Sequence, residues 1–178
     1  MRNICLILFS LAVAGLTWLS ADITQACRRT TPVSLDEICL KADAIVVATA
    51  VKYLELPVGN IRQLNTPGNV EIQFDTTDVL KGRNLPESIS LNGYLTDVDD
   101  FNDRPVPYDF VRPGGRGGSC FAYEYKQGAK FLLFLKKIDG RLTINWDALS
   151  PVNEQLKSSE DESKKWVEQH LRRMEKNR

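Results

Sequence analysis

The feature that most constrains this chain lies at its start, where a long apolar run leads into a cysteine. Residues 1–3 form a short basic start, residues 4–19 are almost unbroken apolar, and residues 20–26 are polar. This is the order of a secretory signal peptide, which is removed and takes no part in the fold. Cleavage after Ala26 makes Cys27 the first residue of the mature chain, with a free α-amino group beside its sulfur.

Two cleavage sites fit this start, one after Ala21 and one after Ala26. The second is favoured because it leaves small residues at both recognition positions. A retained membrane anchor is one alternative, but the apolar run is short for a span of about 20 residues. A lipid on Cys27 is another, although Thr24 stands where lipoproteins usually carry Leu. We therefore expect a secreted, extracellular protein, or a periplasmic or lipid-anchored one in a bacterium.

The composition is that of one globular domain. The chain is 43% hydrophobic and 26% charged with a formal net charge of zero, and its length fits one domain better than two. A neutral chain has no general attraction to nucleic acid or anionic lipid. We therefore expect a monomer that binds neither nucleic acid nor, after signal cleavage, a membrane.

The mature chain keeps three cysteines, Cys27, Cys39 and Cys120. In an oxidising compartment they make one bridge and leave one thiol, and the spacing leaves all three pairings open. The sequence has no CxxC or HExxH motif, and its one histidine is His170. It therefore predicts no structural zinc site and no cofactor of the protein's own.

Hydrophobic periodicity predicts a mainly β protein. Ser34 and Glu37 form a capping box for a short helix over residues 34–42, which buries Cys39 on its apolar face. A charged helix is predicted near the C-terminus, where apolar residues recur at helical spacing. Five runs read as strands, with Asp139 and Gly140 as a hairpin turn between the last two: residues 44–54, 70–80, 88–91, 130–138 and 141–146. Together they predict a five-stranded OB-fold β-barrel with a short N-terminal helix and a C-terminal helix.

The pattern is lost over residues 93–119, which are rich in acidic residues, proline and glycine. Loops of this length are usually functional or mobile. The glycines could form an anion-binding nest, but a connection that lets Cys120 reach its partner is favoured. Four carboxylates in this loop could act as acid/base groups or bind calcium weakly, but a solvated acidic loop is the preferred interpretation: Asp97, Asp99, Asp100 and Asp103. We therefore expect that the protein is not an enzyme.

Several of these pieces together resemble a known family. Cys27 is followed twelve residues later by Cys39, then by Lys-Ala-Asp-Ala-Ile-Val-Val-Ala over residues 41–48. Asp-Val-Leu-Lys-Gly over residues 78–82, Cys120 beside an aromatic residue, the 130–135 strand, the hairpin and Pro151 follow in the same order. Residues 27–155 thus resemble the N-terminal, netrin-like OB-fold domain of the tissue inhibitors of metalloproteinases. Residues 1–26 are then the signal peptide and 156–178 a charged C-terminal helix.

The resemblance implies a site at the mature N-terminus. It implies a Cys27–Cys120 disulfide and chelation of a target protease's catalytic zinc by the Cys27 amine and carbonyl. Cys39 is expected to be a free thiol, because the chain has no cysteine where the family places its partner. Arg28, Arg29 and Thr30 would contact that protease, and its zinc would be the only metal involved. A terminal amine, with an ordinary pKa near 8, deprotonates readily beside a metal. The chelate would displace the water that occupies the protease zinc's open position.

Several departures from the family pattern bear on this interpretation. Arg29 replaces the family's second cysteine, no cysteine lies near Asp147 to pair with one, and the family's cysteine-rich C-terminal domain is missing. Arg28 stands where the family places Thr or Ser, and burying its charge in an apolar pocket costs several kcal/mol. The alternative is a secreted OB-fold binding module without inhibitory activity, which uses residues 93–119 for a protein or glycan partner.

Overall fold

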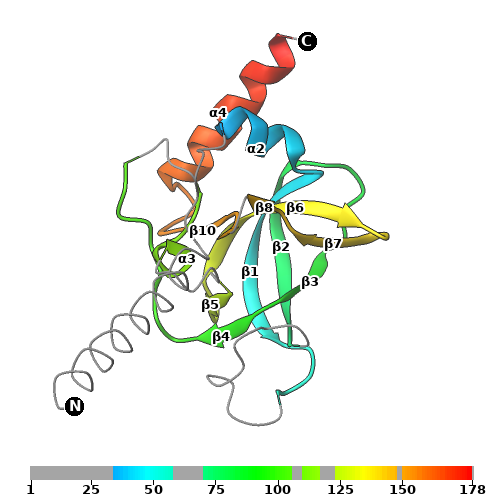
Figure 1. Cartoon of the computed structure of the whole chain (residues 1–178), viewed down its shortest axis with the longest axis vertical. Helices are drawn as coiled ribbons and strands as arrows, with labels where there is room; N and C mark the ends of the chain where they lie inside the picture. Colours follow the sequence, from blue (N-terminus) through cyan, green and yellow to red (C-terminus); the bar gives the residue numbers. More distant parts are fainter. Residues whose placement is uncertain (1–33, 58–69, 106–109, 117–122, 148–149, 178) are drawn as a thin grey trace, which may run out of the picture.

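The computed structural model describes residues 34–57, 70–105, 110–116, 123–147 and 150–177 (Figure 1). This part of the chain is mainly β with a helix near each end, as predicted. The helices are α2 (Leu35–Lys41), the single turn α3 (Pro113–Arg116) and α4 (Glu162–Lys176). The strands are β1 (Ala44–Tyr53), β2 (Glu71–Lys81), β3 (Ser88–Asn92), β4 (Tyr94–Thr96), β5 (Glu124–Lys126), β6 (Lys130–Ile138), β7 (Arg141–Ile144), β8 (Trp146–Asp147), β9 (Ser150–Pro151) and β10 (Asn153–Gln155).

One antiparallel sheet forms the body of the fold, in the order β10-β6-β1-β2-β3, with β7 also paired to β6. β6 pairs with β1 along one edge; on the other edge it pairs first with β10 and then with β7. The sheet therefore has six strands rather than the predicted five, because the short β10 adds to β6. Among the described strands it is not closed into a ring.

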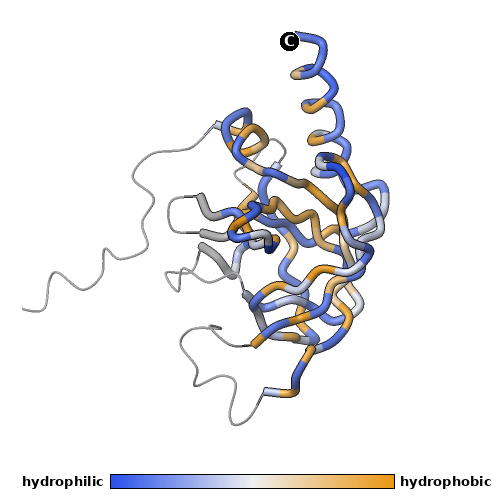
Figure 2. Tube along the Cα trace, turned by 90° about the vertical axis from the view of Figure 1, so that its right-hand side faces the viewer, coloured by the Kyte–Doolittle hydropathy of each residue, from blue (hydrophilic) through white to orange (hydrophobic). Residues whose placement is uncertain are grey.

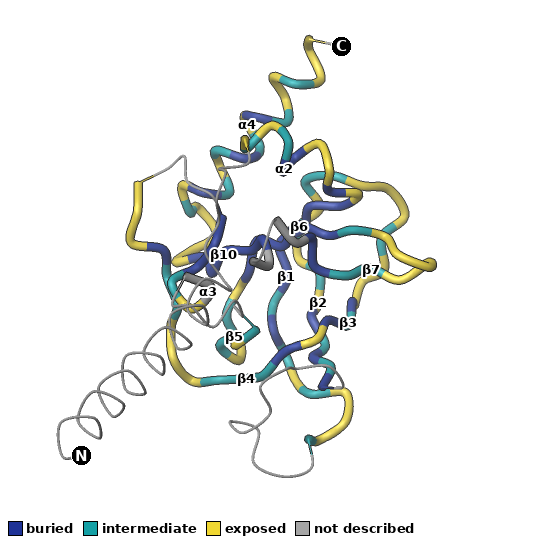
Figure 3. The backbone as a smooth tube through the Cα atoms, viewed as in Figure 1, coloured by how far each residue is buried: buried dark blue, intermediate teal, exposed yellow. Residues whose placement is uncertain are grey.

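The two central strands are buried on both faces, which is why they read as continuous apolar runs. Alternate residues of β1 and β6 belong to two separate cores, and both strands are buried over much of their length (Figure 3). The first core lies on one face of the sheet: Ala44, Val46, Ala48, Ala50, Ile72, Phe74, Ile89, Leu91, Tyr125, Phe131, Leu133, Leu135 and Ile144. The second lies on the other face: Ile38, Cys39, Ala42, Ile45, Val47, Phe110, Leu132, Phe134, Val152, Leu156 and Val167.

The α2 and α4 helices lie beside each other over the second core (Figure 1). The Ser34 hydroxyl accepts a hydrogen bond from the Glu37 amide at 3.2 Å, so Ser34 caps α2 as predicted. At the other end of α2, the Lys81 ammonium donates to the carbonyl oxygens of Cys39, Leu40 and Ala42. These are carbonyls that a helix end leaves without a partner in the helix.

The amphipathic helix α4 carries its apolar residues as a stripe (Figure 2). Asp161 caps its first turn by accepting from the Ser163 amide at 2.9 Å. His170 lies on the buried side, with Nε2 2.8 Å from Oδ1 of Asp36 on α2 and its ring stacked 4.7 Å from the ring of Trp166. His170 therefore serves packing between the two helices. None of the helices in the described ranges is long and apolar enough to span a membrane.

Two predictions about irregular segments need correction. Residues 93–119 contain β4 and the turn α3, and β4 pairs in parallel with β5. The predicted strand over residues 141–146 stops at Ile144, and Asn145 separates β7 from β8. Propensity alone could not reveal β4 and β5, because each has three residues and their pairing depends on tertiary contacts.

Candidate functional site

Most of the predicted site residues lie outside the described part of the chain. They are Cys27, Arg28, Arg29, Thr30 and Cys120. The described residues that flank Cys120 are those up to Arg116 and those from Tyr123 onward. The candidate site is therefore built from the contacts that hold these two flanks.

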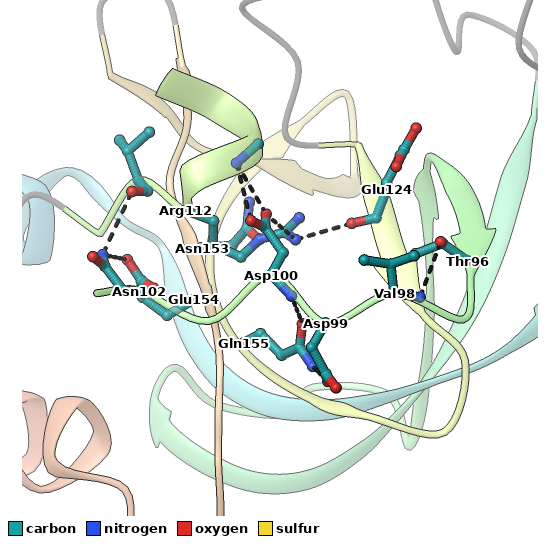
Figure 4. Close-up of polar contacts among 12 residues, drawn as sticks. Thr96, Val98, Asp99, Asp100, Asn102, Arg112, Glu124, Asn153, Glu154 and Gln155 are labelled. Carbon is teal, nitrogen blue, oxygen red and sulfur yellow. Dashed lines mark hydrogen bonds and ion pairs between the residues drawn. The ribbon is translucent and has the colours of Figure 1, made fainter. Parts of the chain in front are cut away.

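A buried arginine ties the two flanks together (Figure 4). Arg112 donates from Nε to Asn153 Oδ1 at 2.6 Å, and from Nη1 to Asp100 Oδ2 and to the Glu124 carbonyl oxygen, both at 2.9 Å. We call Asp100, Arg112, Asn153 and this carbonyl the Arg112 cluster. The cluster brings four segments together at one point. They are the loop after β4, the residues just before α3, strand β5 and strand β10.

The Arg112 side chain is fully buried, at 0% exposure. A buried charge needs a partner and hydrogen bonds, and the cluster supplies a carboxylate, an amide oxygen and a carbonyl. Its guanidinium carbon also lies 5.0 Å from the ring centroid of Tyr125 and 5.1 Å from that of Phe131, in cation–π geometry. Only the planar, five-donor guanidinium fits these partners together.

Asp100 also holds the start of α3. Its carboxylate accepts a hydrogen bond from the Gly114 amide at 3.0 Å. A Cβ at position 114 would lie 2.9 Å from Asp100 Oδ2, so the close approach favours glycine there. The backbone amide of Asp100 in turn donates to Gln155 Oε1 at 2.7 Å. Asp100 therefore connects α3, which precedes Cys120 in the sequence, to β10.

Asp99 and Asn102 add two further contacts from the same loop. Asp99 pairs with Lys126 at 2.6 Å and accepts from Gln155 Nε2 at 2.6 Å. The hydrogen bond from Lys126 lowers the pKa of Asp99, although burial partly opposes this. Asn102, itself buried, donates to Glu154 Oε1 at 2.8 Å. Residues 99–102 are thus fixed along β10 and against β5.

The residues that follow Cys120 in the sequence, from Tyr123 onward, are fixed against β4. The Tyr123 carbonyl accepts from the Tyr94 amide at 2.7 Å. A Cβ added to Gly93 would lie 2.7 Å from that same carbonyl oxygen and from the Tyr125 ring, so only glycine fits this approach. Burial raises the pKa of Tyr125 to about 12, which keeps its phenol neutral beside the guanidinium. Both flanks of residues 117–122 are therefore held by one polar framework.

The contacts of the Arg112 cluster hold backbone segments in place. The carboxylates of Asp99 and Asp100, weighed above as acid/base groups, have cationic and amide partners. In the described ranges, no group of three or more His, Cys, Asp or Glu side chains could hold a metal ion. Cys39 lies at 0% exposure in the second core as a free thiol, and burial raises its pKa to about 11. Its side chain packs in the core.

Sequence reasoning missed the Arg112 cluster. Arg112 was seen only as the first residue of a glycine-rich stretch, and Asn153 was not singled out. One signal was available, because an arginine that follows Phe110 and Val111 lies next to apolar residues that need a core. No protein-family model matches the sequence, and no curated protein matches it.

Proposed function

We propose that this protein is a secreted inhibitor of zinc metalloproteinases, related to the tissue inhibitors of metalloproteinases. In this proposal the mature chain begins at Cys27, a disulfide joins Cys27 to Cys120, and the Cys27 amine and carbonyl chelate the catalytic zinc of the target. Arg28, Arg29 and Thr30 contact the protease beside that zinc. The protein contributes no metal of its own.

The strand order supports the OB-fold part of this proposal. The path β7-β6-β1-β2-β3 contains five antiparallel-paired strands. β3 and β7, the two ends of this path, lie next to each other (Figure 1). Pairing between them would close a five-stranded barrel around the first core, which is the framework expected of an OB-fold.

The observation that carries the functional proposal is the anchoring of both flanks of Cys120. A zinc-chelating terminus binds well only if it is held rigidly before the protease arrives, because immobilising it during binding costs free energy. The Arg112 cluster and the Gly93–Tyr123 approach would stiffen the segment that carries Cys120. Through the proposed disulfide, that stiffness would pass to Cys27.

The first experiment determines the mature N-terminus and the disulfide. The full chain would be secreted from a host that cleaves signal peptides, and the product analysed intact and as non-reduced peptides by mass spectrometry. The proposal expects a chain that begins at Cys27, a Cys27–Cys120 linked peptide and an unmodified α-amino group. A chain that begins at Asp22, or an acyl group on Cys27, rejects the chelation mechanism.

The second experiment tests inhibition itself. The mature protein and a form with one added N-terminal alanine would be assayed against a panel of zinc endopeptidases. The added residue removes the free Cys27 amine from the chelating position, so inhibition should disappear. Equal potency of the two forms rejects chelation.

Arg28 supports a second candidate function. If the wild-type chain and Arg28→Thr both fail to inhibit the whole panel, the protein is better described as a secreted OB-fold binding module. If Arg28→Thr inhibits more strongly than the wild type, the inhibitor framework is intact and Arg28 sets its specificity. That result would follow from the desolvation cost of the guanidinium in an apolar pocket.

A further inference from the structure

A groove of about 430 Å³ opens between β3 and β7, two strands that lie next to each other in Figure 1. It is lined by the turn before β3, the first half of β3, the start of β1 and the β6–β7 hairpin. Its volume falls within the range of sites that bind small ligands. The groove shares no residue with the Arg112 cluster, so it is separate from the proposed inhibitory site.

The groove carries an excess of positive charge. Arg83, Lys137 and Arg141 line it, against one carboxylate, Asp43. Arg141 is paired with Glu71 at 2.8 Å, and Asp43 accepts from the Lys137 backbone amide at 2.8 Å. In the described ranges, neither the Arg83 nor the Lys137 side chain forms an ion pair. Two cationic groups therefore face the groove without a carboxylate of their own.

Arg83 lies in a segment of unusual backbone conformation before β3. Gly82 has φ 112° and Asn84 has φ 53°, so Arg83 lies between two residues in the left-handed half of backbone space. Asparagine and glycine are the residues that adopt such conformations most readily. Arg83 and Asn84 both line this wall of the groove. The Asn84 amide adds a neutral hydrogen-bond donor beside the guanidinium.

The remaining walls set the kind of ligand. Leu85, Ile89 and Leu142 give the groove an apolar portion. Ser88 and Ser90 also line it, but their hydroxyls donate to Asp75 and Glu71. The donors left for a ligand are thus the Arg83 guanidinium, the Lys137 ammonium and the Asn84 amide. This combination suits an oxyanion attached to a small, partly apolar body.

We propose that the groove between β3 and β7 binds a phosphate or sulfate group carried by a small ligand, held by Arg83, Lys137 and Asn84. Arginine and lysine at these positions also repel a second copy of the same sheet edge, which protects an edge strand from self-association. That protective role requires positive charge alone. Saturable binding of an oxyanion distinguishes the proposed ligand site from this protective role.

The test is an NMR titration of the ¹⁵N-labelled full mature chain at constant ionic strength, with chloride as the competing anion. The probes are inorganic phosphate, inorganic sulfate, O-phosphoserine and galactose 6-sulfate. Saturable shifts should appear at the amides of Asn84, Gly140 and Leu142. Arg83→Gln and Lys137→Gln should each weaken binding by about tenfold, the loss expected for one charge-assisted hydrogen bond. Lys165→Gln, on the exposed face of α4, is the matched control and should bind as the wild type does.

Tighter binding of either organic probe than of the inorganic ions would support the site and identify its carrier group. Equal binding of all four would support a site that reads the oxyanion alone. The proposal is overturned if the shifts fail to saturate, or if they appear equally around Lys165. It is also overturned if both groove variants bind as the wild type, because the positive charges would then have only a protective role.

Discussion

Arg112 Nη1 and Asp100 Oδ2 lie 2.9 Å apart, and the guanidinium is fully buried whereas the carboxylate side chain is 23% exposed. The pair is therefore asymmetric, since only the acid keeps contact with water. Because the arginine has no contact with water, protein groups must supply all the hydrogen bonds of its guanidinium. Its removal should affect the fold more than the removal of any surface charge.

Arg112→Met should destabilise the protein by about 3 kcal/mol, because removal of one member of a buried pair leaves the other without its compensation. Breaking a buried pair usually costs about 3–5 kcal/mol. The cost here should lie at the low end because Asp100 is partly solvated. Urea unfolding measures the change directly. Arg112→Lys should recover only part of the loss, since a single ammonium cannot reach three partners in the geometry of the fork.

Arg172→Met is the matched control, because the Arg172 side chain is 66% exposed and pairs only distantly with Glu168. Its cost should stay within about 0.5 kcal/mol. Equal costs for the two variants would show that the Arg112 cluster contributes no more than a surface charge. The Arg112 cluster would then not anchor the flanks of Cys120.

Gly93→Ala should destabilise the protein by about 1–3 kcal/mol, the usual cost of overpacking. The added methyl would meet the Tyr123 carbonyl oxygen and the Tyr125 ring, both at 2.7 Å. We expect the chemical shifts of residues 94–96 and 123–126 to move together, because these residues pair across the contact. Asn92→Ala, on the exposed end of β3, is the control and should leave those shifts unchanged.

The central strands could be predicted from sequence for a clear physical reason. Residues 44–48 of β1 and 131–135 of β6 are buried, and their side chains alternate between the two cores, so every residue in these stretches is apolar. The apolar run therefore predicts a strand whichever residues face each core. The hairpin turn was equally predictable. Asp139 and Gly140 have φ values of 49° and 81°, the positive pair that a two-residue turn requires.

The Arg112 cluster could not be predicted, because its partners are distant in sequence. Arg112 meets Asp100 twelve residues away and Asn153 forty-one residues away. An arginine among glycines is ordinarily exposed, and only the fold brings a carboxylate and an amide to bury it. The β4–β5 pair could not be predicted for a different reason, because strands of three residues carry almost no periodicity.

The stability of the protein should fall at alkaline pH because of Cys39. Burial raises the pKa of its thiol from 9.0 to about 11. Between these values the unfolded chain loses the thiol proton and the folded chain keeps it, so the free energy of unfolding falls as pH rises. The slope reaches at most about 1.4 kcal/mol per pH unit, and below pH 9 the effect is absent.

Urea unfolding of the wild type and of Cys39→Ala at pH 8, 9, 10 and 11 measures this contribution. The alanine variant should be less stable at pH 8 but lose less stability between pH 9 and 11. Tyr123 and Tyr125, whose pKa values burial raises to about 12, contribute equally to both proteins. Parallel curves would show that the thiol has an ordinary pKa and lies within reach of solvent.

Lys81→Met should destabilise α2 by about 2 kcal/mol, because the ammonium donates to three carbonyls at the end of that helix and such charge-assisted bonds are stronger than neutral ones. Amide hydrogen exchange of Ile38 and Ala42 should speed up more than exchange in β6. Lys41→Met is the control, since Lys41 forms an exposed pair with Glu37 on the same helix. It should cost a few tenths of a kcal/mol. If both variants speed exchange in α2 equally, the bonds from Lys81 contribute no more than a surface pair, and the packing of Ile38 and Cys39 alone fixes the helix.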